Sequence, residues 1–484
     1  MRALIALLTI GVLYQTIGYG IRARTVCAMW WHAPAGDGLQ YAEIASTLLS
    51  AKRFALHDLK PTWSRPPVYP LFLAYVVDKK VLPLEEHLIR ATRWNGWLDA
   101  STALAVWLIA YRRRLFASGW MALVGVLACP LLILLQCYAL SESLATLLTT
   151  LTILCAVFAL DGRVLVWAAL AGALGGLLML TRTDGVTVIP PVLLGLCLAT
   201  ASRRRRALAI GLFAAAWMAV LSPWAYRNYR EFGQPHLLGA KWMAKDGTPM
   251  RTGPEEWMWT WERHASAGLM NLRMLSRTHL DLTLMPPDVI ESPAERAAVI
   301  RALDHCNAVG VTKPVSDEFA KLARDRARHS PFEVFVKTPI GRMVDMWLDT
   351  IQEGDMPLNV APFGLAQRSL FTRFDRRLYA LALAGLALAL LPGVGRRQWK
   401  LALLIAVAAL TRTGVDGYTQ AHVTQRYLVE VYPLLILLAA MSVELTARRL
   451  IALKALLTDG ADRHADARHD AQNLGETSTK EHLP

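Results

Sequence analysis

Asp37 stands between two glycines at the start of the stretch GDGLQYAEIASTLLSAKRFAL. Glycine on either side lets other backbone come close, and a carboxylate in such a place is suited to take a proton from an acceptor hydroxyl group. The alternative is that Asp37 caps the helix that follows it. Apolar residues recur there at helical spacing: Tyr41, Ile44, Ala45 and Leu48.

Charged residues also stand at the ends of apolar runs further along the chain. Arg93 opens one such run and is suited to bind two oxygens of a phosphate, or to pair with Asp99 inside the run. Glu142 opens another run, either as a helix cap stabilised by the helix dipole or as part of a site. Arg182 and Asp184 share a turn, in which they either pair with each other or line a cavity.

The remaining candidates flank the later apolar runs. Arg227 and Asn228 follow one run, and His422 and Arg426 stand before the last one. The sequence has no Cys-x-x-Cys pair and no Cys/His cluster with zinc-ligand spacing, so we expect a site that works without a metal.

The apolar runs are long enough to cross a membrane. The chain has 484 residues, of which 54% are hydrophobic, and its mean hydropathy is +0.31. A run of about 18 or more apolar residues with few charges predicts a spanning helix. Ten runs qualify: 3–21, 94–111, 119–138, 143–160, 164–180, 185–201, 207–225, 378–394, 400–415 and 427–445.

The basic residues indicate the topology of these spans. With the N-terminus inside, fifteen Lys and Arg residues flank the inner helix ends and three flank the outer ends. Counting the short apolar stretch 67–77 as an eleventh span would reverse this bias, so we expect it to be an interfacial helix. The net charge of +14 therefore reports topology and lipid contact, and no nucleic-acid partner is expected.

This topology divides the chain into four parts. Residues 1–225 form a membrane module that contains a first outer loop, 22–93. A large outer loop, 226–377, precedes the C-terminal spans in 378–445, and a polar inner tail, 446–484, is expected to be disordered. Within the large loop Trp257, Trp259 and Trp261 alternate, which predicts a strand, an interfacial ribbon or an aromatic belt. Cys27 and Cys306 fall in the two outer loops, where an oxidising compartment would allow them to pair.

Five segments, in order, resemble one family. After Asp37 come RPPVYPLFLA from Arg65, LSESL at 140–144, LTRTDG at 180–185, SPWAYRNYREFGQP at 222–235 and QRYLVEVYP at 425–433. Their order and the topology are similar to those of the C-type glycosyltransferases (GT-C superfamily), in the branch of the protein O-mannosyltransferases and the aminoarabinose–lipid A transferase. The resemblance covers residues 1–240 well and 378–445 loosely.

The resemblance implies an all-α polytopic fold with a seven-span module, interfacial helices in the first outer loop and a variable C-terminal part. It implies a polyprenyl-phosphate-linked sugar as donor, a lipid, glycan or protein as acceptor, and no metal. Asp37 would be the catalytic base or would orient the acceptor. Protein O-mannosyltransferases have Asp-Glu at this point, and Gly38 here argues against protein mannosylation.

In that family an arginine at the place of Arg93 lies near the carrier phosphate. We expect Arg93, Arg182 and Arg227 to bind the donor phosphate. The cavity would be lined by a further set of residues: Tyr41, Arg65, Tyr69, Glu142, Asp184, Asn228, His422 and Arg426. Transfer would invert the anomeric carbon, at the periplasmic face of a bacterial inner membrane. A transporter or flippase, or a lipopolysaccharide ligase-like protein, is the alternative, since these also have many spans.

Overall fold

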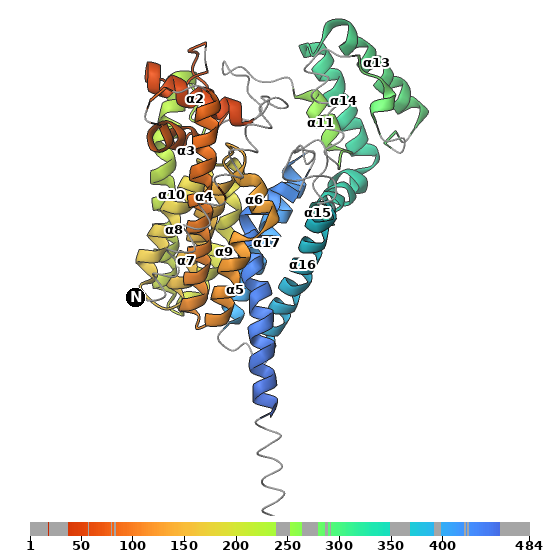
Figure 1. Cartoon of the computed structure of the whole chain (residues 1–484). Coiled ribbons are helices and arrows are strands. Elements are labelled where there is room, and N and C mark those ends of the chain that lie inside the picture. Colours follow the sequence, from red (N-terminus) through yellow and green to blue (C-terminus); the bar gives the residue numbers. More distant parts are fainter. Residues whose placement is uncertain are drawn as a thin grey trace, which may run out of the picture.

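The computed structural model is a helical bundle with two helical regions at one end (Figure 1). It describes residues 18, 37–56, 58–78, 80–81, 84–238, 252–263, 279–285, 289–290, 292–348, 368–391, 398–420, 423 and 425–454. The predicted first span 3–21 (save residue 18), Cys27, His422 and the tail beyond residue 454 lie outside these residues. Among the described residues no strand forms, which confirms the all-α fold class.

The predicted spans after the first one appear in order as helices. They are α4 (Leu84–Arg112), α5 (Phe116–Leu127), α6 (Pro130–Gln136), α7 (Glu142–Ala159), α8 (Val164–Met179), α9 (Ile189–Ala199) and α10 (Arg203–Phe232). The third predicted span is divided, since α5 and α6 meet at an angle of 45°. Pro130 opens α6 and cannot donate a helical hydrogen bond to the preceding turn, which explains the break.

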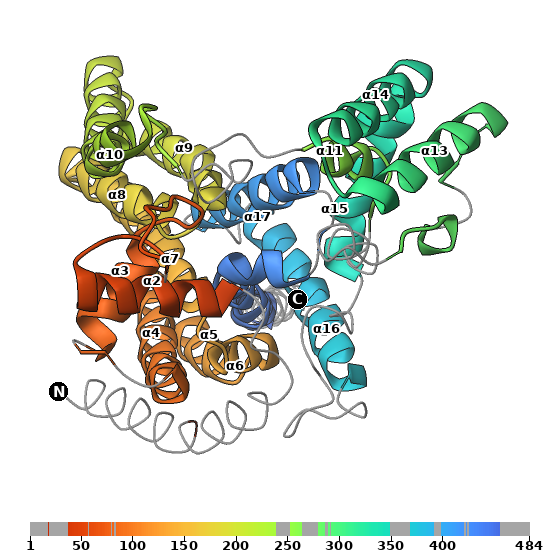
Figure 2. The same cartoon turned by 90° about the horizontal axis from the view of Figure 1, so that it is seen from above.

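Three more helices complete the bundle: α16 (Arg368–Leu390), α17 (Trp399–Thr419) and a C-terminal helix, Gln425–Lys454. The C-terminal helix begins as a 3-10 segment, η7 (Gln425–Val431). It lies at the centre of the bundle, seen end-on in Figure 2, and 94% of its most apolar window is buried. It continues past the predicted end at 445 to Lys454, and Arg448 in this extension pairs with Glu444 one turn earlier.

Four described helices are long and apolar enough to cross a membrane: Glu142–Ala159, Arg203–Phe232, Trp399–Thr419 and Gln425–Lys454. The bent pair α5–α6 passes the same test as one unit. Shorter apolar helices cover 164–179 and 183–199. The chain therefore has several membrane-spanning helices, while the count of about ten stays a prediction.

The first outer loop forms helices that lie over one end of the bundle (Figure 1). These are α2 (Asp37–Ala51), α3 (Val68–Phe72) and the π-helical η1 (Leu73–Asp78). The predicted amphipathic face of α2 is confirmed, since Tyr41, Ile44, Ala45 and Leu48 are all buried. They pack against Tyr69 and Leu73 of the 68–78 segment in one apolar cluster.

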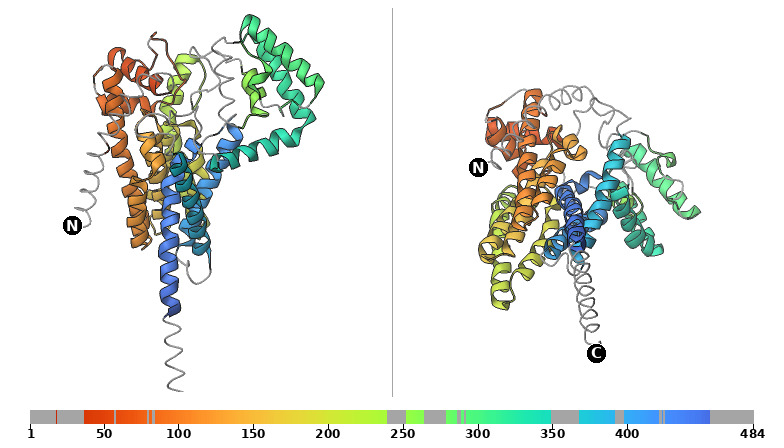
Figure 3. Two further views of the ribbon diagram at one scale, coloured as in Figure 1. Left: turned by 45° about the vertical axis from the view of Figure 1, so that its right-hand side comes forward. Right: turned by 60° about the horizontal axis from the view of Figure 1, so that its bottom comes forward.

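The second outer region has its own small core. Its helices are α11 (Gly253–Trp259), α13 (Pro293–Val309), α14 (Lys313–His329), the π-helical η5 (Glu333–Lys337) and α15 (Thr338–Leu348). Figure 3 shows α15 running across the direction of the C-terminal helix.

The strand, ribbon or belt predicted from the alternating tryptophans is wrong. Trp257 lies in α11, and Trp261 follows one turn later. Both side chains are buried and their rings are 5.4 Å apart, with Phe319 of α14 against Trp257. Trp259 points elsewhere and donates to the carbonyl of Tyr418 in α17. The alternation therefore reflects a helical turn whose two buried rings form an outer core.

Candidate functional site

The start of α2 packs directly against the turn that leads into α7. A Cβ atom at Gly38 would lie 3.2 Å from the carbonyl oxygen of Ala139 in that turn. This contact is tighter than most Cβ contacts, so a glutamate following Asp37 would press on the turn. The departure from the Asp-Glu pattern thus has a packing reason, and it brings Asp37 beside the N-terminus of α7.

Asp37 is held by an arginine from the other half of the first outer loop. Its Oδ1 atom forms an ion pair with Nη2 of Arg65, whose Nε atom donates to Oε1 of Gln40 at 2.7 Å. The Asp37 side chain keeps 39% of its surface exposed and Arg65 keeps 23%. The ion pair fixes the orientation of a carboxylate that a substrate can still reach.

Tyr41 connects this pair to the bundle. The guanidinium of Arg65 lies 5.5 Å from the centre of the Tyr41 ring, and the ring of Tyr69 meets it edge-on at 5.0 Å. The Tyr41 hydroxyl lies 3.5 Å from Oγ of Ser141, the residue before Glu142. Burial raises the pKa of Tyr41, so the phenol stays neutral and acts as a hydrogen-bonding group and not as a base.

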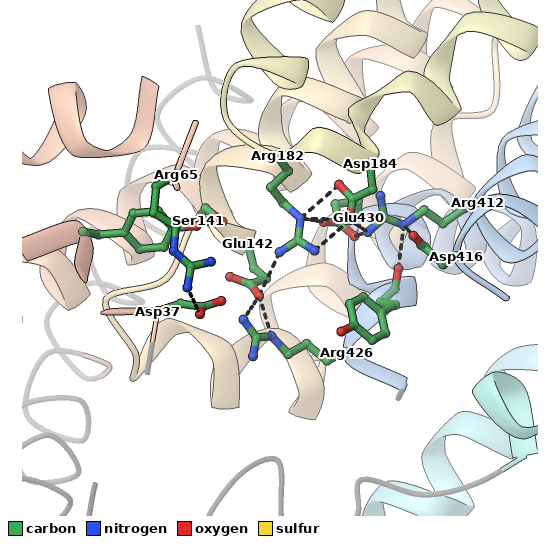
Figure 4. Close-up of polar contacts among 12 residues, drawn as sticks. Asp37, Arg65, Ser141, Glu142, Arg182, Asp184, Arg412, Asp416, Arg426 and Glu430 are labelled. Carbon is green, nitrogen blue, oxygen red and sulfur yellow. Dashed lines mark hydrogen bonds and ion pairs between the residues drawn. The ribbon is translucent and has the colours of Figure 1, made fainter. Parts of the chain in front are cut away.

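Glu142 begins α7 and accepts two guanidinium groups from distant segments (Figure 4). Its Oε1 atom lies 3.0 Å from Nη1 of Arg182 and 2.5 Å from Nε of Arg426. The other oxygen, Oε2, is buried and has no hydrogen-bond partner among the described residues. Glu142 is 1% exposed, whereas Arg426 is 25% exposed and forms the rim of the site. Glu142 is therefore part of a polar cluster and does more than cap α7.

A deeper layer of ion pairs lies behind Glu142 (Figure 4). Arg182 pairs with Asp184 at 2.8 Å and with Glu430 at 3.0 Å. Arg412 pairs with Asp184 at 2.8 Å, with Asp416 at 2.8 Å and with Glu430 at 2.9 Å. The pairing of Arg182 with Asp184 is therefore confirmed, while their lining of a cavity stays a prediction.

The charges of this ion network nearly balance. Its carboxylates are Glu142, Asp184, Asp416 and Glu430, and its guanidinium groups are Arg182, Arg412 and Arg426. Its interior is therefore no anion site. Among the described residues around this network, the guanidinium groups that reach the surface belong to Arg426 and Arg65, which lie near Asp37 at the exposed rim (Figure 4).

Two predicted arginines lie elsewhere. Arg227 donates to the carbonyls of Thr62 and Phe54 at 2.8 and 3.0 Å, and its neighbour Asn228 donates to the carbonyl of His236. The Arg227 contacts tie α10 to the first outer loop. Arg93 lies on α4 and is exposed, and its binding of a donor phosphate stays a prediction.

Three residues of the network were not among the sequence candidates: Arg412, Asp416 and Glu430. Charged residues inside an apolar run mark functional or paired positions in membrane proteins. Arg412 lies inside the apolar run 400–415, and Asp416 follows directly after it. Glu430 lies within the quoted segment QRYLVEVYP. These charges within or beside apolar runs were the signal that could have marked the three residues as candidates.

No group of three potential metal ligands occurs among the residues that the structure describes. The metal-independent site stays a prediction.

No family model matches the chain, and no curated protein matches it. Among solved structures it is similar to the oligosaccharyltransferase of Archaeoglobus fulgidus, with a TM-score of 0.47 and 12% identity over 92% of this chain and 51% of that one. A structure of this archaeal enzyme, AglB, with an inhibitory peptide and dolichol-phosphate gives a TM-score of 0.48 at 12% identity, over 92% and 51%.

ArnT from Cupriavidus metallidurans bound to undecaprenyl phosphate matches with a TM-score of 0.41 and 13% identity, over 92% of this chain and 78% of that one. Both neighbours are polyprenyl-phosphate-dependent glycosyltransferases of the GT-C superfamily. This chain spans about half the length of the oligosaccharyltransferase chains that it matches. At such identities and TM-scores these matches assign no role to any residue.

Proposed function

We propose that this protein is a membrane glycosyltransferase that takes a sugar from a polyprenyl-phosphate donor and transfers it to a hydroxyl or amino group. One observation carries the proposal: a half-exposed carboxylate, Asp37, lies at the rim of a buried ion network beside two partly exposed guanidinium groups, Arg65 and Arg426. The quoted segments that resemble the GT-C family supply most of these residues.

The rim provides the groups that sugar transfer needs. Asp37 accepts the proton of the acceptor hydroxyl while the oxygen of that hydroxyl attacks C1 of the sugar. The C1–O bond to the phosphate breaks on the opposite face, the electron pair stays with the phosphate, and the anomeric centre inverts. Arg426 and Arg65 are placed to meet the charge that gathers on that phosphate.

The ion network behind the rim has a positioning role. The ion pairs of Arg182 and Arg412 with their acidic partners join the turn after α8, α17 and the C-terminal helix, and so hold these segments together. We propose no metal and place the site at the outer face of a bacterial inner membrane.

The test is donor turnover by the purified full-length protein in lipid nanodiscs. A set of polyprenyl-phosphate-linked sugars is offered with a total glycolipid extract, and release of polyprenyl phosphate is measured with and without a chelator. Turnover that persists with the chelator, needs no ion gradient and is lost in Asp37→Asn supports the proposal. Asp58→Asn is the matched control, because Asp58 is an exposed acid of the same loop outside the site. Failure of every donor, or substrate movement that requires an ion gradient, would contradict it and indicate transport.

A further inference from the structure

A basic pocket lies at the opposite end of the bundle from Asp37. It has a volume of about 450 Å³ and is lined by Arg112, Arg113 and Arg114 from the end of α4, Asp161 after α7, and Trp399 and Lys400 at the start of α17. None of these residues belongs to the ion network. We propose that this pocket binds a phosphate group, supplied by the headgroup of an anionic glycerophospholipid in the adjacent leaflet.

The charge of the lining favours an anion. Among the described residues, the lining includes four cationic residues and one acidic residue. Asp161 accepts from Nε of Arg112 at 2.9 Å and from Nη1 of Arg113 at 3.0 Å. One carboxylate neutralises only part of this charge, so the pocket keeps a positive excess that a phosphate can balance.

The side chains that form the pocket are held in place. The Arg113 side chain is 11% exposed, whereas Arg112 is 51% exposed and so reaches solvent. Gln398 donates to the carbonyl of Arg113 at 2.9 Å, and Arg448 donates to that of Arg114 at 2.7 Å. Because the backbone of this turn is tied to two other helices, the guanidinium groups are organised before any ligand binds.

Lys400 and Trp399 close the other side. The Lys400 ammonium donates to the carbonyl of Leu198 at 3.1 Å and lies 5.8 Å from the centre of the Trp399 ring. Tryptophan is enriched at the boundary between hydrocarbon and water. A phosphate among the cations would place the glycerol part of a lipid beside this ring.

The position of the pocket fits a leaflet boundary. The helix α7 begins at Glu142 of the ion network and ends at Ala159, just before the pocket residue Asp161. A helix of 18 residues is about 27 Å long at 1.5 Å per residue, close to the roughly 30 Å of a hydrocarbon core. The pocket therefore lies at the level of headgroups on the face opposite to Asp37.

Membrane topology alone would explain basic residues on this face. Arg203 to Arg206 are an example of such residues, and they differ from the pocket residues. Arg203, Arg204 and Arg205 are exposed on the first turn of α10, and none of the four lines the pocket. The arginines at the end of α4 instead converge with Lys400 around a hollow. Basic pockets between helices on the cytoplasmic side are typical sites for anionic headgroups.

The test is lipid binding to the full-length protein by native mass spectrometry, with phosphatidylglycerol and phosphatidylcholine offered at equal amounts. We expect retention of phosphatidylglycerol over phosphatidylcholine, and at least a tenfold loss of this preference in Arg112→Gln/Lys400→Gln. The control Arg204→Gln/Arg205→Gln removes as many charges from the same face and should keep the preference. Single Lys400→Gln, expected to show a smaller loss, serves if the double variant does not fold.

Competition distinguishes the source of the phosphate. Millimolar inorganic phosphate or glycerol phosphate should leave the bound lipid in place, because neither has the acyl chains that hold it in the leaflet. Displacement of the lipid by inorganic phosphate at such concentrations would overturn the lipid assignment and indicate that the pocket binds a soluble anion. Equal retention of both lipids, or an equal loss of the preference in the control variant, would overturn the proposal. The basic residues of the pocket would then only set the orientation of the protein in the membrane.

Discussion

Arg412 in α17 lies 2.8 Å from Asp184 in the turn between α8 and α9, although 228 residues separate them in the sequence. Arg412 is 2% exposed and also meets Asp416 and Glu430. One buried guanidinium thus holds three carboxylates from three segments. The C-terminal helices are therefore built into the site and are more than a variable appendage.

The first prediction concerns this buried guanidinium. Arg412→Leu should lower the free energy of unfolding by about 3–5 kcal/mol, because it leaves uncompensated charges in the interior. Arg412→Lys keeps the charge but loses the planar fork and should cost less. Thermal unfolding in detergent, with exposed Arg449→Gln as the control, measures both. An unchanged melting temperature for Arg412→Leu would show that the ion network does not stabilise the fold.

The second prediction concerns Asp37. Asp37→Asn should lower turnover by about 10²–10⁴-fold, the usual share of a general base. Its ion pair with Arg65 is partly exposed, so the loss should change stability by no more than about 1 kcal/mol. Turnover and melting temperature are measured on the same preparation, with Asp58→Asn beside it. Turnover close to that of the wild type would leave Asp37 as a helix cap.

Local patterns predicted the elements, and tertiary contacts decided the site. The spacing of Tyr41, Ile44, Ala45 and Leu48 was sufficient to predict α2, because apolar residues at helical spacing indicate which face of a helix is buried. The pairing of Glu142 with Arg426 spans 284 residues and depends on where the C-terminal helix packs, which no local pattern contains. Alternating tryptophans misled, since two buried rings one helical turn apart and one outward ring also give that spacing.

Arg227 shows a second limit of reasoning from sequence. An arginine at an outer helix end runs against the charge bias, and this argued for a ligand-binding role. The structure shows another reason for its presence, because its guanidinium is occupied by the carbonyls of Thr62 and Phe54. Charge bias identifies a residue with a special partner, but it cannot tell a backbone carbonyl from a phosphate.

The third prediction separates two candidates for the donor phosphate. Arg426→Lys should weaken donor use by about 10- to 100-fold, because a bidentate contact to phosphate is worth roughly 1.5–3 kcal/mol. Arg93→Ala should affect donor use less than Arg426→Lys does, and should hardly change stability, since Arg93 is exposed on α4. Michaelis constants for the donor decide between them. A larger effect of Arg93→Ala would move the phosphate away from the rim and toward α4.

The fourth prediction concerns pH and the outer region. Burial raises the pKa of Glu262 to about 8, while the nearby guanidinium of Arg342 offsets part of this rise. Arg342 donates to the backbone carbonyl of Glu262 at 2.7 Å and so joins α15 to the end of α11. Between pH 4.5 and 8 the folded state keeps a proton that the unfolded state releases. Stability of this region should therefore be greatest below about pH 4.5 and fall as pH rises toward 8.

Hydrogen exchange of α11 and α15, corrected for the intrinsic effect of pH, measures this dependence. Protection in the wild type should decrease from pH 5 to pH 8, whereas Glu262→Gln should remove most of the slope. Protection in the bundle helix α7 serves as the internal reference. A wild-type slope that persists unchanged in Glu262→Gln would assign the pH dependence to another group.

The last prediction is the topology on which the location of both sites depends. Ser118, buried and bonded through its Oγ atom to Glu444 at 2.6 Å, is a poor reporter, because a cysteine there would be protected in either orientation. Ser202 before α10 and Lys60 in the first outer loop are both exposed, so cysteines at these positions report the two faces. An impermeant maleimide added to intact cells should label Lys60→Cys and spare Ser202→Cys until the membrane is opened. Wild-type protein gives the background from its native cysteines. Labelling of Ser202→Cys in sealed cells would show that the predicted orientation is wrong, with Asp37 inside and the basic pocket at the outer leaflet.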